Sequence, residues 1–383
     1  MSLTGFTEKL FRSRRTRVTF TLLMIASLVF ILSILFVSTE NKNWPMNAAF
    51  ECNATDLRAA QRQYFENHLR PGYGYARFFS NKAWTDQVAI ALYFMGMQDF
   101  GCHTCPNPQH LTFIDVGANI GQTVRFISEL LKEQESKFPK GSTFKIVSVE
   151  PSPQTYTELV KEVKRARLMG GHEYISLNNG VGEKRGLLQF YSHGNGDQGA
   201  TFNVAARQGR PRHSMVKVIT VDDIVNYHGG HGKVILKIDV EGFETNVMRG
   251  AANALQHKRI DALVWEWVPE KMSKGSLKEQ ADFLSKYGYE VFISTLHVMV
   301  RIDSEYWDDG YETTRKTINC AAYRRDSTEL LAIKSRNYLC GGLGSTSEEF
   351  FFNACECWSG KKSELPPDSF QELKQNGFPM GRE

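Results

Sequence analysis

The chain has 383 residues, of which 42% are hydrophobic and 23% are charged, and this composition is sufficient for at least one large hydrophobic core. The formal net charge is only +4. Much of that excess lies at the extreme N-terminus, so nucleic acid is not expected as a partner. Neither number indicates an oligomeric state.

The first element in the chain is an uncharged apolar segment of twenty residues, 18–37, which is long enough to span a bilayer. The alternative, a cleaved signal peptide, normally has a shorter apolar core and a small-residue cleavage site, and no clear site of that kind follows here. The positive-inside rule places the N-terminus in the cytosol, because five basic residues precede the segment: Lys9, Arg12, Arg14, Arg15 and Arg17. We therefore expect a cytosolic tail (1–17), a type II signal anchor (18–37) and a lumenal remainder in the secretory pathway, with the Golgi as the expected compartment.

Residues 38–110 are expected to form a stem that leads into a helical cap. A glycosylation sequon lies just beyond the anchor, at Asn53, and it suits a lumenal location.

Seven cysteines also suit an oxidising compartment, and the odd number leaves one thiol free or available for an intermolecular bridge. Structural disulfides are the favoured interpretation of Cys102 and Cys105. A zinc site completed by Cys355 and Cys357 is the alternative. The C-terminal tail, 336–383, is expected to be irregular and tied by its cysteines.

Between residues 111 and 335 apolar runs alternate with amphipathic segments, a pattern typical of an α/β domain with a mainly parallel sheet. Helices are predicted after the first run, where Val124, Ile127 and Leu131 share one face, and after the second, where Ser152 can cap a helix beginning at Pro153. The stretch between the third and fourth runs predicts an inserted hairpin. The seven runs are 111–117, 144–152, 174–182, 234–242, 261–267, 289–295 and 319–324.

The loop after the first run, within FIDVGANIGQT (113–123), has the spacing D-x-G-x-N-x-G. It lacks the G-x-G-x-x-G fingerprint of dinucleotide-binding loops. A carboxylate at Asp115, just before Gly117, would repel a pyrophosphate and suits a ligand that carries a cation. S-adenosylmethionine, which has a sulfonium and an amino group and no phosphate, meets that requirement. The predicted loop contacts are Asp115, Gly117, Asn119 and Gly121.

Two later runs supply further predicted contacts for the same cofactor. Glu150 ends the second run, where an acid can accept both hydroxyls of a ribose. Asn179 and Gly180 follow the third run and are small enough to approach an adenine edge. The alternative is that Gly117 and Gly121 merely turn the chain.

Five segments together resemble the FkbM family of S-adenosylmethionine-dependent O-methyltransferases: FIDVGANIGQT, VSVEPSPQTYTEL, ITVDDIV, LKIDVEGFETNVMRGA and VWEW. The resemblance runs from about residue 113 to residue 323, and DVEG-x-E is its most distinctive motif. It implies a class I methyltransferase fold, an α/β Rossmann-like sheet of seven mostly parallel strands with the last strand antiparallel and helices on both faces. It also implies acceptors that are hydroxyls, often on sugars, so a glycan or another hydroxyl-bearing acceptor is the expected partner.

Three acids are the candidate catalytic residues, because they end the fourth and fifth runs, where ligands of such sheets bind. We expect Asp239 or Glu241 to lie near the acceptor hydroxyl as a base or through a bound cation, with Glu266 beside them. A divalent metal is possible at Asp239 and Glu241 but is not implied. The alternative is that these acids cap the following helix. Glu244 is predicted to be such a helix-start acid.

The remaining polar and aromatic candidates are given structural roles. Asp222 and Asp223 are predicted to cap a short helix and not to bind metal. His193 and His297 are possible bases, but each is more simply a solvated loop residue. An ion pair is expected for Lys237. Trp265 and Trp267 either stack on a ligand or pack in the core.

Two other functional classes remain open at this point. A type II Golgi glycosyltransferase would use Asp239 and Glu241 as a cation and sugar-nucleotide site, but it would leave the glycine loop without a function. A catalytically inactive scaffold is disfavoured, because the predicted cofactor residues are intact.

Overall fold

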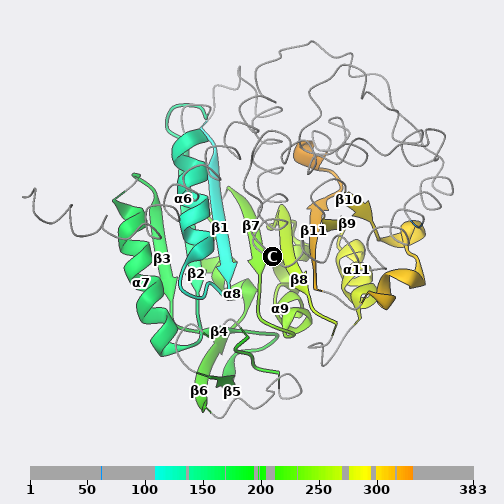
Figure 1. The fold of residues 1–383 in the computed structure, drawn as a ribbon. Helices are drawn as coiled ribbons and strands as arrows, with labels where there is room; N and C mark the ends of the chain where they lie inside the picture. The colour runs from blue at the N-terminus through cyan, green and yellow to red at the C-terminus, as the bar shows by residue number, and fades with distance from the viewer. Residues whose placement is uncertain are drawn as a thin grey trace, which may run out of the picture.

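The computed structural model describes Arg62 and residues 108–330, apart from 135–137, 169, 194–196, 198, 204–211, 231, 270–275, 295–298, 315 and 316. Its centre is an eight-stranded sheet in the order β10-β9-β11-β8-β7-β1-β2-β3 (Figure 1). The strands are β1 (His110–Val116), β2 (Thr143–Val149), β3 (Glu173–Leu177), β7 (Lys233–Ile238), β8 (Ala262–Trp267), β9 (Tyr289–Ser294), β10 (Met299–Arg301) and β11 (Ile318–Arg324).

The strand directions agree with the predicted α/β class. Strands β3, β2, β1, β7 and β8 run parallel to one another, and β11 is inserted antiparallel between β8 and β9. This order is consistent with the class I methyltransferase fold. One detail of the prediction is wrong: the sheet has an eighth strand, because the short β10 folds back antiparallel on β9. Three residues are too few to stand out as an apolar run in the sequence.

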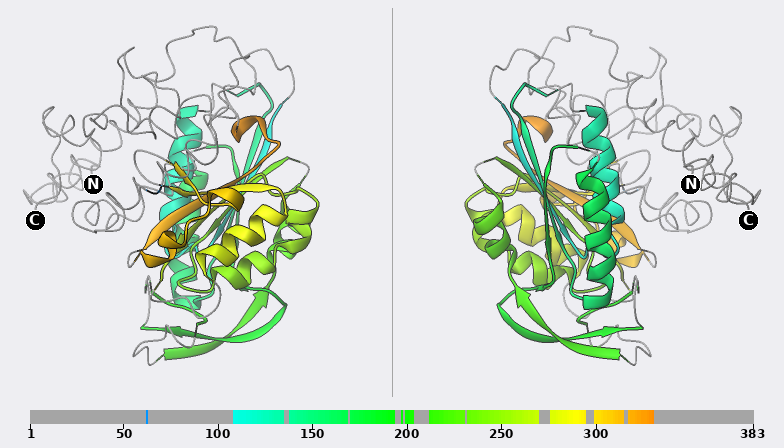
Figure 2. Two further views of the ribbon diagram at one scale, coloured as in Figure 1. Left: turned by 90° about the vertical axis from the view of Figure 1, so that its right-hand side faces the viewer. Right: turned by 90° about the vertical axis from the view of Figure 1, so that its left-hand side faces the viewer.

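Helices cover both faces of the sheet (Figure 2). On one face lie α6 (Gln122–Gln134) and α7 (Pro153–Arg167); on the other lie α8 (Val221–His228), α9 (Glu244–Arg249), α10 (Ala252–Gln256) and α11 (Leu277–Lys286). A hydrophobic core lies on each face of the sheet, because successive side chains of β1 point to opposite faces. Phe113 belongs to the core with α6 and α7, and Ile114 belongs to the core with α8 to α11. Two 3-10 helices, η4 (Ser304–Tyr306) and η5 (Asp309–Thr313), precede β11.

The helix boundaries follow local capping chemistry. Helix α7 begins as predicted, with the Ser152 hydroxyl accepting the Thr155 N–H and Pro153 in the first turn. Helix α8 begins with a capping box in which Thr220 and Asp223 each accept the other's backbone N–H. The predicted stripe of α6, Val124, Ile127 and Leu131, is buried.

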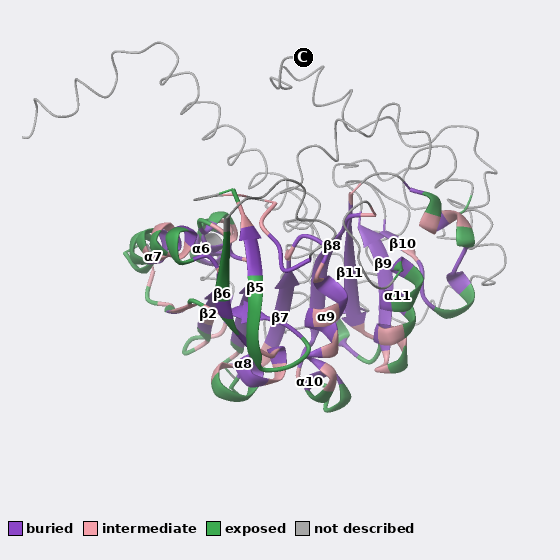
Figure 3. Cartoon of the chain, turned by 90° about the horizontal axis from the view of Figure 1, so that it is seen from below, coloured by how far each residue is buried: buried purple, intermediate pink, exposed green. Residues whose placement is uncertain are grey.

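The predicted insertion is a second sheet of three strands, β4 (Gly180–Val181), β5 (Gly186–Ser192) and β6 (Arg212–Ile219), in the order β4-β6-β5. Its β5 and β6 pair antiparallel as a hairpin that projects below the main sheet in Figure 1. Seen from below, the main strands are largely buried, whereas exposed residues gather on the outer helices and on β5 and β6 (Figure 3).

Several predictions fall on residues that the structure does not describe: the anchor at 18–37, the sequon at Asn53, the tail at 336–383 and six of the seven cysteines. Within the described residues, none of the helices has the length and apolarity needed to cross a bilayer. The described cysteine, Cys320, is a free buried thiol in β11, and burial raises its pKa.

Candidate cofactor and acceptor site

The candidate site lies at the carboxyl ends of β1, β7 and β8. From β1 the sheet extends to one side through β2 and β3 and to the other side through β7 and β8. The point between β1 and β7 is therefore a topological switch point, where ligands of open α/β sheets bind. Asp115 stands directly opposite Lys237 in the β1–β7 register. Asp239 directly follows β7, and Glu266 lies near the end of β8 at the neighbouring position, because Ile238 pairs with Trp265. Side-chain alternation therefore directs these four polar residues to the same face of the sheet.

The glycine loop after β1 has a backbone that few residues adopt. Gly117 and Gly121 have φ values of 84° and 93°, and Asn119 between them has φ 48°, a left-handed conformation that asparagine tolerates better than most residues. The N–H groups of Gly117 and Ala118 both donate to the carbonyl of Val149. These hydrogen bonds fix the loop across the ends of β1 and β2, and the positive φ values explain why glycine occupies positions 117 and 121.

Gly117 also allows a close approach of β7, and this gives a testable effect on stability. A Cβ at this position would lie 1.9 Å from the carbonyl oxygen of Asp239. We expect Gly117→Ala to lower the unfolding free energy by about 3 kcal/mol, from the sum of the positive-φ cost and the displaced backbone. Gly288 is the matched control, because it has φ 85° and a Cβ added there would meet no other atom within 4 Å. Denaturant unfolding should show a clearly smaller loss for Gly288→Ala; equal losses would mean that the contact with Asp239 has no energetic weight.

Asp115 is fully buried beneath this loop, and its nearest described cation is Lys237. The Lys237 Nζ lies 3.6 Å from Asp115 Oδ1 and 3.2 Å from Asp239 Oδ2, which confirms the predicted ion pair for Lys237. Burial raises the pKa of Asp115, and the Lys237 ammonium partly offsets this rise. The carboxylate that was expected to meet a ligand cation therefore already has a cationic neighbour from the protein.

Glu150 follows β2 and holds the glycine loop through its carboxylate. One oxygen accepts the N–H of Asn119 at 3.0 Å and the other accepts the N–H of Ser152 at 2.9 Å. Burial raises the pKa of Glu150 from 4.5 to about 7, against the lowering effect of these two donors. Each carboxylate oxygen keeps a further lone pair, so the predicted ribose contact is compatible with this arrangement.

Asn179 and Gly180 join the two sheets. Asn179 donates its side-chain amide to the carbonyl of Lys217, and Gly180 begins β4. The ring of Phe202 fills the space beside Gly180, because a Cβ added there would lie 2.4 Å from that ring. This packing accounts for the glycine without a ligand, and the contact with an adenine edge stays a prediction.

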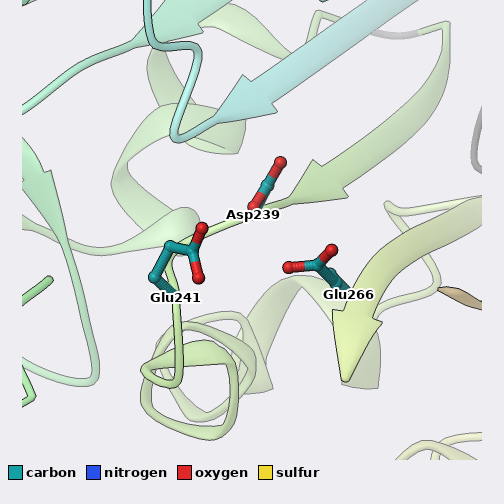
Figure 4. Close-up of side chains that lie close together, drawn as sticks. All are labelled: Asp239, Glu241 and Glu266. Carbon is teal, nitrogen blue, oxygen red and sulfur yellow. The ribbon is translucent and has the colours of Figure 1, made fainter. Parts of the chain in front are cut away.

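The three candidate catalytic acids converge in the structure. Carboxylate oxygens of Asp239, Glu241 and Glu266 all lie within 4.8 Å of one another, and Figure 4 shows the three groups directed toward one point from the end of β7, the loop after it and the end of β8. Glu241 and Glu266 are buried, whereas the side chain of Asp239 is 41% exposed. Asp239 is therefore the member of this acid triad that an acceptor from solvent reaches most easily. The spacing also suits carboxylate ligands of a metal ion.

The loop that carries Glu241 is held by two residues outside the triad. Glu241 has φ 56°, and its carbonyl accepts a 2.9 Å hydrogen bond from the buried hydroxyl of Thr201, which lies between β5 and β6 of the insertion. The Glu244 carboxylate accepts the N–H groups of Val240 and Gly242 at 3.0–3.2 Å. Glu244 does begin α9, as predicted, but its carboxylate organises the preceding loop. Nothing in the local sequence links Thr201 to Glu241, because they are 40 residues apart.

Glu244 also predicts a dependence of stability on pH. It is fully buried, and burial raises its pKa from 4.5 to about 8. An acid that holds its proton more tightly in the folded state contributes stability that is lost as pH rises through the folded pKa. We therefore expect the unfolding free energy to fall between about pH 5 and pH 8, and Glu244→Gln to reduce this slope. Urea unfolding at several pH values measures it; an unchanged slope in Glu244→Gln would contradict the assignment.

The other candidates take structural positions. Asp223 caps its own helix α8 as predicted. The prediction for Asp222 is wrong in its target, because Asp222 accepts the N–H groups of Asn253 and Ala254 at the start of α10. Trp265 and Trp267 lie in the hydrophobic core, which confirms the packing interpretation. His193 is exposed, and His297 lies outside the described residues.

Comparison with known proteins gives one match to a family. Residues 115–291 match the Methyltransferase FkbM domain. No curated protein matches the chain. Solved structures with some likeness include the METTL16 methyltransferase domain (13% identity, 61% of this chain and 66% of that one, TM-score 0.30) and the plantazolicin methyltransferase BpumL in complex with S-adenosylhomocysteine (9%, 70% and 95%, 0.29). A human methyltransferase 10 domain containing protein is similar at 10% identity (71% and 98%, 0.29).

TM-scores this low carry no argument about fold or reaction, and the alignment with the METTL16 domain spans slightly under two thirds of that domain. The family match covers the glycine loop, Glu150 and all three acids of the triad. It supports an FkbM-type methyltransferase domain in this chain, with S-adenosylmethionine as its cofactor.

Proposed function

We propose that this protein is an O-methyltransferase that transfers the methyl group of S-adenosylmethionine to an acceptor hydroxyl bound beside Asp239. The observation that carries the proposal is the convergence of three carboxylates within 4.8 Å, at the switch point of the sheet and next to the glycine loop. An acid cluster so close to the cofactor loop suits a reaction in which a hydroxyl must lose a proton.

The residues present fit the cofactor. A Cβ at Gly117 would collide with the Asp239 carbonyl, so this glycine lets the cofactor loop lie directly against the segment that carries the acid triad. The surrounding side chains are mainly acids, including Asp115, Glu150 and Asp239, which suits a ligand that carries positive charge and no phosphate. Glu150 would hold the ribose, and Asp115 and the glycine loop would hold the amino-acid end.

When bound, S-adenosylmethionine would supply an electrophilic methyl group to the acceptor oxygen. The bond between sulfur and the methyl carbon would break as the oxygen–carbon bond forms, and its electron pair would stay on the sulfur of S-adenosylhomocysteine. The chain's own part is to orient the acceptor and receive its proton. Asp239 is suited to receive it, because its carboxylate is half-exposed and faces the other two acids. Glu241 and Glu266, both buried, would orient the acceptor through hydrogen bonds to its remaining hydroxyls.

A sugar hydroxyl on a glycan in the secretory pathway is the proposed acceptor. Support comes from the sequence: the apolar segment 18–37 after a basic tail, the sequon at Asn53 and the cysteine content predict a type II membrane protein with a lumenal catalytic domain. Several neighbouring carboxylates also suit a ligand with several hydroxyl donors.

The test uses the full-length chain in detergent with isotopically labelled S-adenosylmethionine and a mixture of released glycans, and mass spectrometry locates the label. We expect label on a sugar oxygen, and we expect transfer to survive treatment with a chelator, since Asp239 acts as a base. Loss on chelation with recovery on adding Mn²⁺ would instead assign the three acids as cation ligands. Transfer of a sugar from a sugar nucleotide, with no methyl transfer, would support the glycosyltransferase alternative.

A further inference from the structure

Lys237 connects the two halves of the candidate site. It lies on β7, directly opposite Asp115 in the register with β1 and two residues before Asp239 on the same face. Its Nζ is 3.6 Å from Asp115 Oδ1 and 3.2 Å from Asp239 Oδ2. One ammonium group thus contacts an acid of the cofactor loop and an acid of the triad.

Lys237 lies between acids that would otherwise repel one another or stand without a counter-charge. The side chain of Asp115 is 0% exposed and that of Lys237 only 6%, so their interaction is weakly screened by solvent. On the other side, Asp239 stands within 4.8 Å of the carboxylates of Glu241 and Glu266. Carboxylates this close repel one another, and a buried carboxylate without a counter-charge takes up a proton.

We propose that Lys237 is a positioning residue that holds the Asp239 carboxylate in the acid triad and fixes the Asp115 carboxylate beneath the cofactor loop. The inference rests on the proposed function, since it assigns Asp115 to the cofactor and Asp239 to the acceptor. It predicts that loss of the ammonium weakens cofactor binding and slows methyl transfer at saturating substrate, whereas a merely structural lysine would affect stability alone.

Lys233 provides a matched control on the same strand. Its Nζ lies 2.6 Å from Glu329 Oε1, and the Glu329 side chain is 3% exposed. Lys233 is therefore also paired with a buried acid, but it lies at the opposite end of β7. Lys237→Met and Lys233→Met remove the same group from the same strand, and only the first removes it beside the candidate site.

The experiment measures thermal unfolding, the Kd of S-adenosylhomocysteine by calorimetry, and kcat for the full-length wild type and both variants at a temperature where all are folded. For Lys237→Met we expect a Kd about tenfold higher and a kcat about 100-fold lower. For Lys233→Met we expect both within about twofold of wild type despite a lower unfolding temperature. Wild-type Kd and kcat in Lys237→Met would overturn the inference.

If Lys237→Met does not fold, Lys237→Gln, which keeps a hydrogen-bond donor without the charge, is judged by the same two readouts. The two proposals fail separately. A wild-type protein that does not bind S-adenosylhomocysteine would contradict the proposed function, whereas normal binding and turnover in the Lys237 variants would contradict the role of Lys237 alone.

Discussion

Replacing Asp239 with asparagine is expected to lower kcat for methyl transfer by about 10²–10⁴-fold, the usual range for loss of a general base. Asparagine keeps the shape of the side chain and an oxygen that can accept from Lys237, but it cannot take up the acceptor proton. The Kd of S-adenosylhomocysteine should change little, because the predicted cofactor contacts lie at or beyond the ends of β1, β2 and β3. Initial-rate kinetics and calorimetry on the same preparation separate the two effects.

Asp282→Asn is the control for that substitution. Asp282 pairs with Lys278 at 2.6 Å on the exposed face of α11, where removing a charge should leave kcat and stability nearly unchanged. If Asp239→Asn turns over at the wild-type rate while Asp282→Asn does the same, Asp239 is not the base, and the proton must leave by another group of the triad.

Replacing Glu241 with glycine is expected to reduce activity strongly without a matching loss of stability. Glu241 has φ 56°, a conformation that costs a residue with a Cβ about 1–2 kcal/mol and costs glycine almost nothing. Glycine keeps the carbonyl that accepts the Thr201 hydroxyl. A glutamate retained in such a conformation, buried beside two other carboxylates, indicates a functional need for its side chain.

We therefore expect the unfolding free energy of Glu241→Gly to stay within about 1 kcal/mol of wild type, since the relief of strain offsets the greater freedom of glycine in the unfolded chain. The kcat should fall by about 100-fold or more if the carboxylate orients the acceptor. Lys258→Gly is the control, because Lys258 has φ 53° and is remote from the triad, on the exposed surface. A Glu241→Gly protein with full activity would remove Glu241 from the site.

Local patterns in the sequence were sufficient for much of the fold. Each of the seven apolar runs supplies a strand of the main sheet, and the third run also contains β4 of the second sheet. The start of α7 at Ser152 followed from capping chemistry that involves only neighbouring residues. The convergence of Asp239, Glu241 and Glu266 could also be expected, because the carboxyl ends of neighbouring parallel strands meet at one edge of a sheet.

The features that sequence reasoning missed depend on contacts between distant segments. Asp222 caps α10, about 30 residues away, and no periodicity indicates which helix end lies beside it. The hydrogen bond from Thr201 to Glu241 requires the insertion to fold back on the β7 loop. Lys237 was expected to pair with an acid, but its position between two acids with separate predicted roles depends on the β1–β7 register.

The most direct test of the central claim is a calorimetric titration of the full-length protein with S-adenosylhomocysteine, run beside a titration with a sugar nucleotide and Mn²⁺. We predict saturable binding of S-adenosylhomocysteine, which is weakened in Glu150→Gln because the ribose loses its carboxylate partner. We predict no binding of the sugar nucleotide. Binding of the sugar nucleotide with Mn²⁺, without binding of S-adenosylhomocysteine, would contradict the assignment of the glycine loop as a cofactor site.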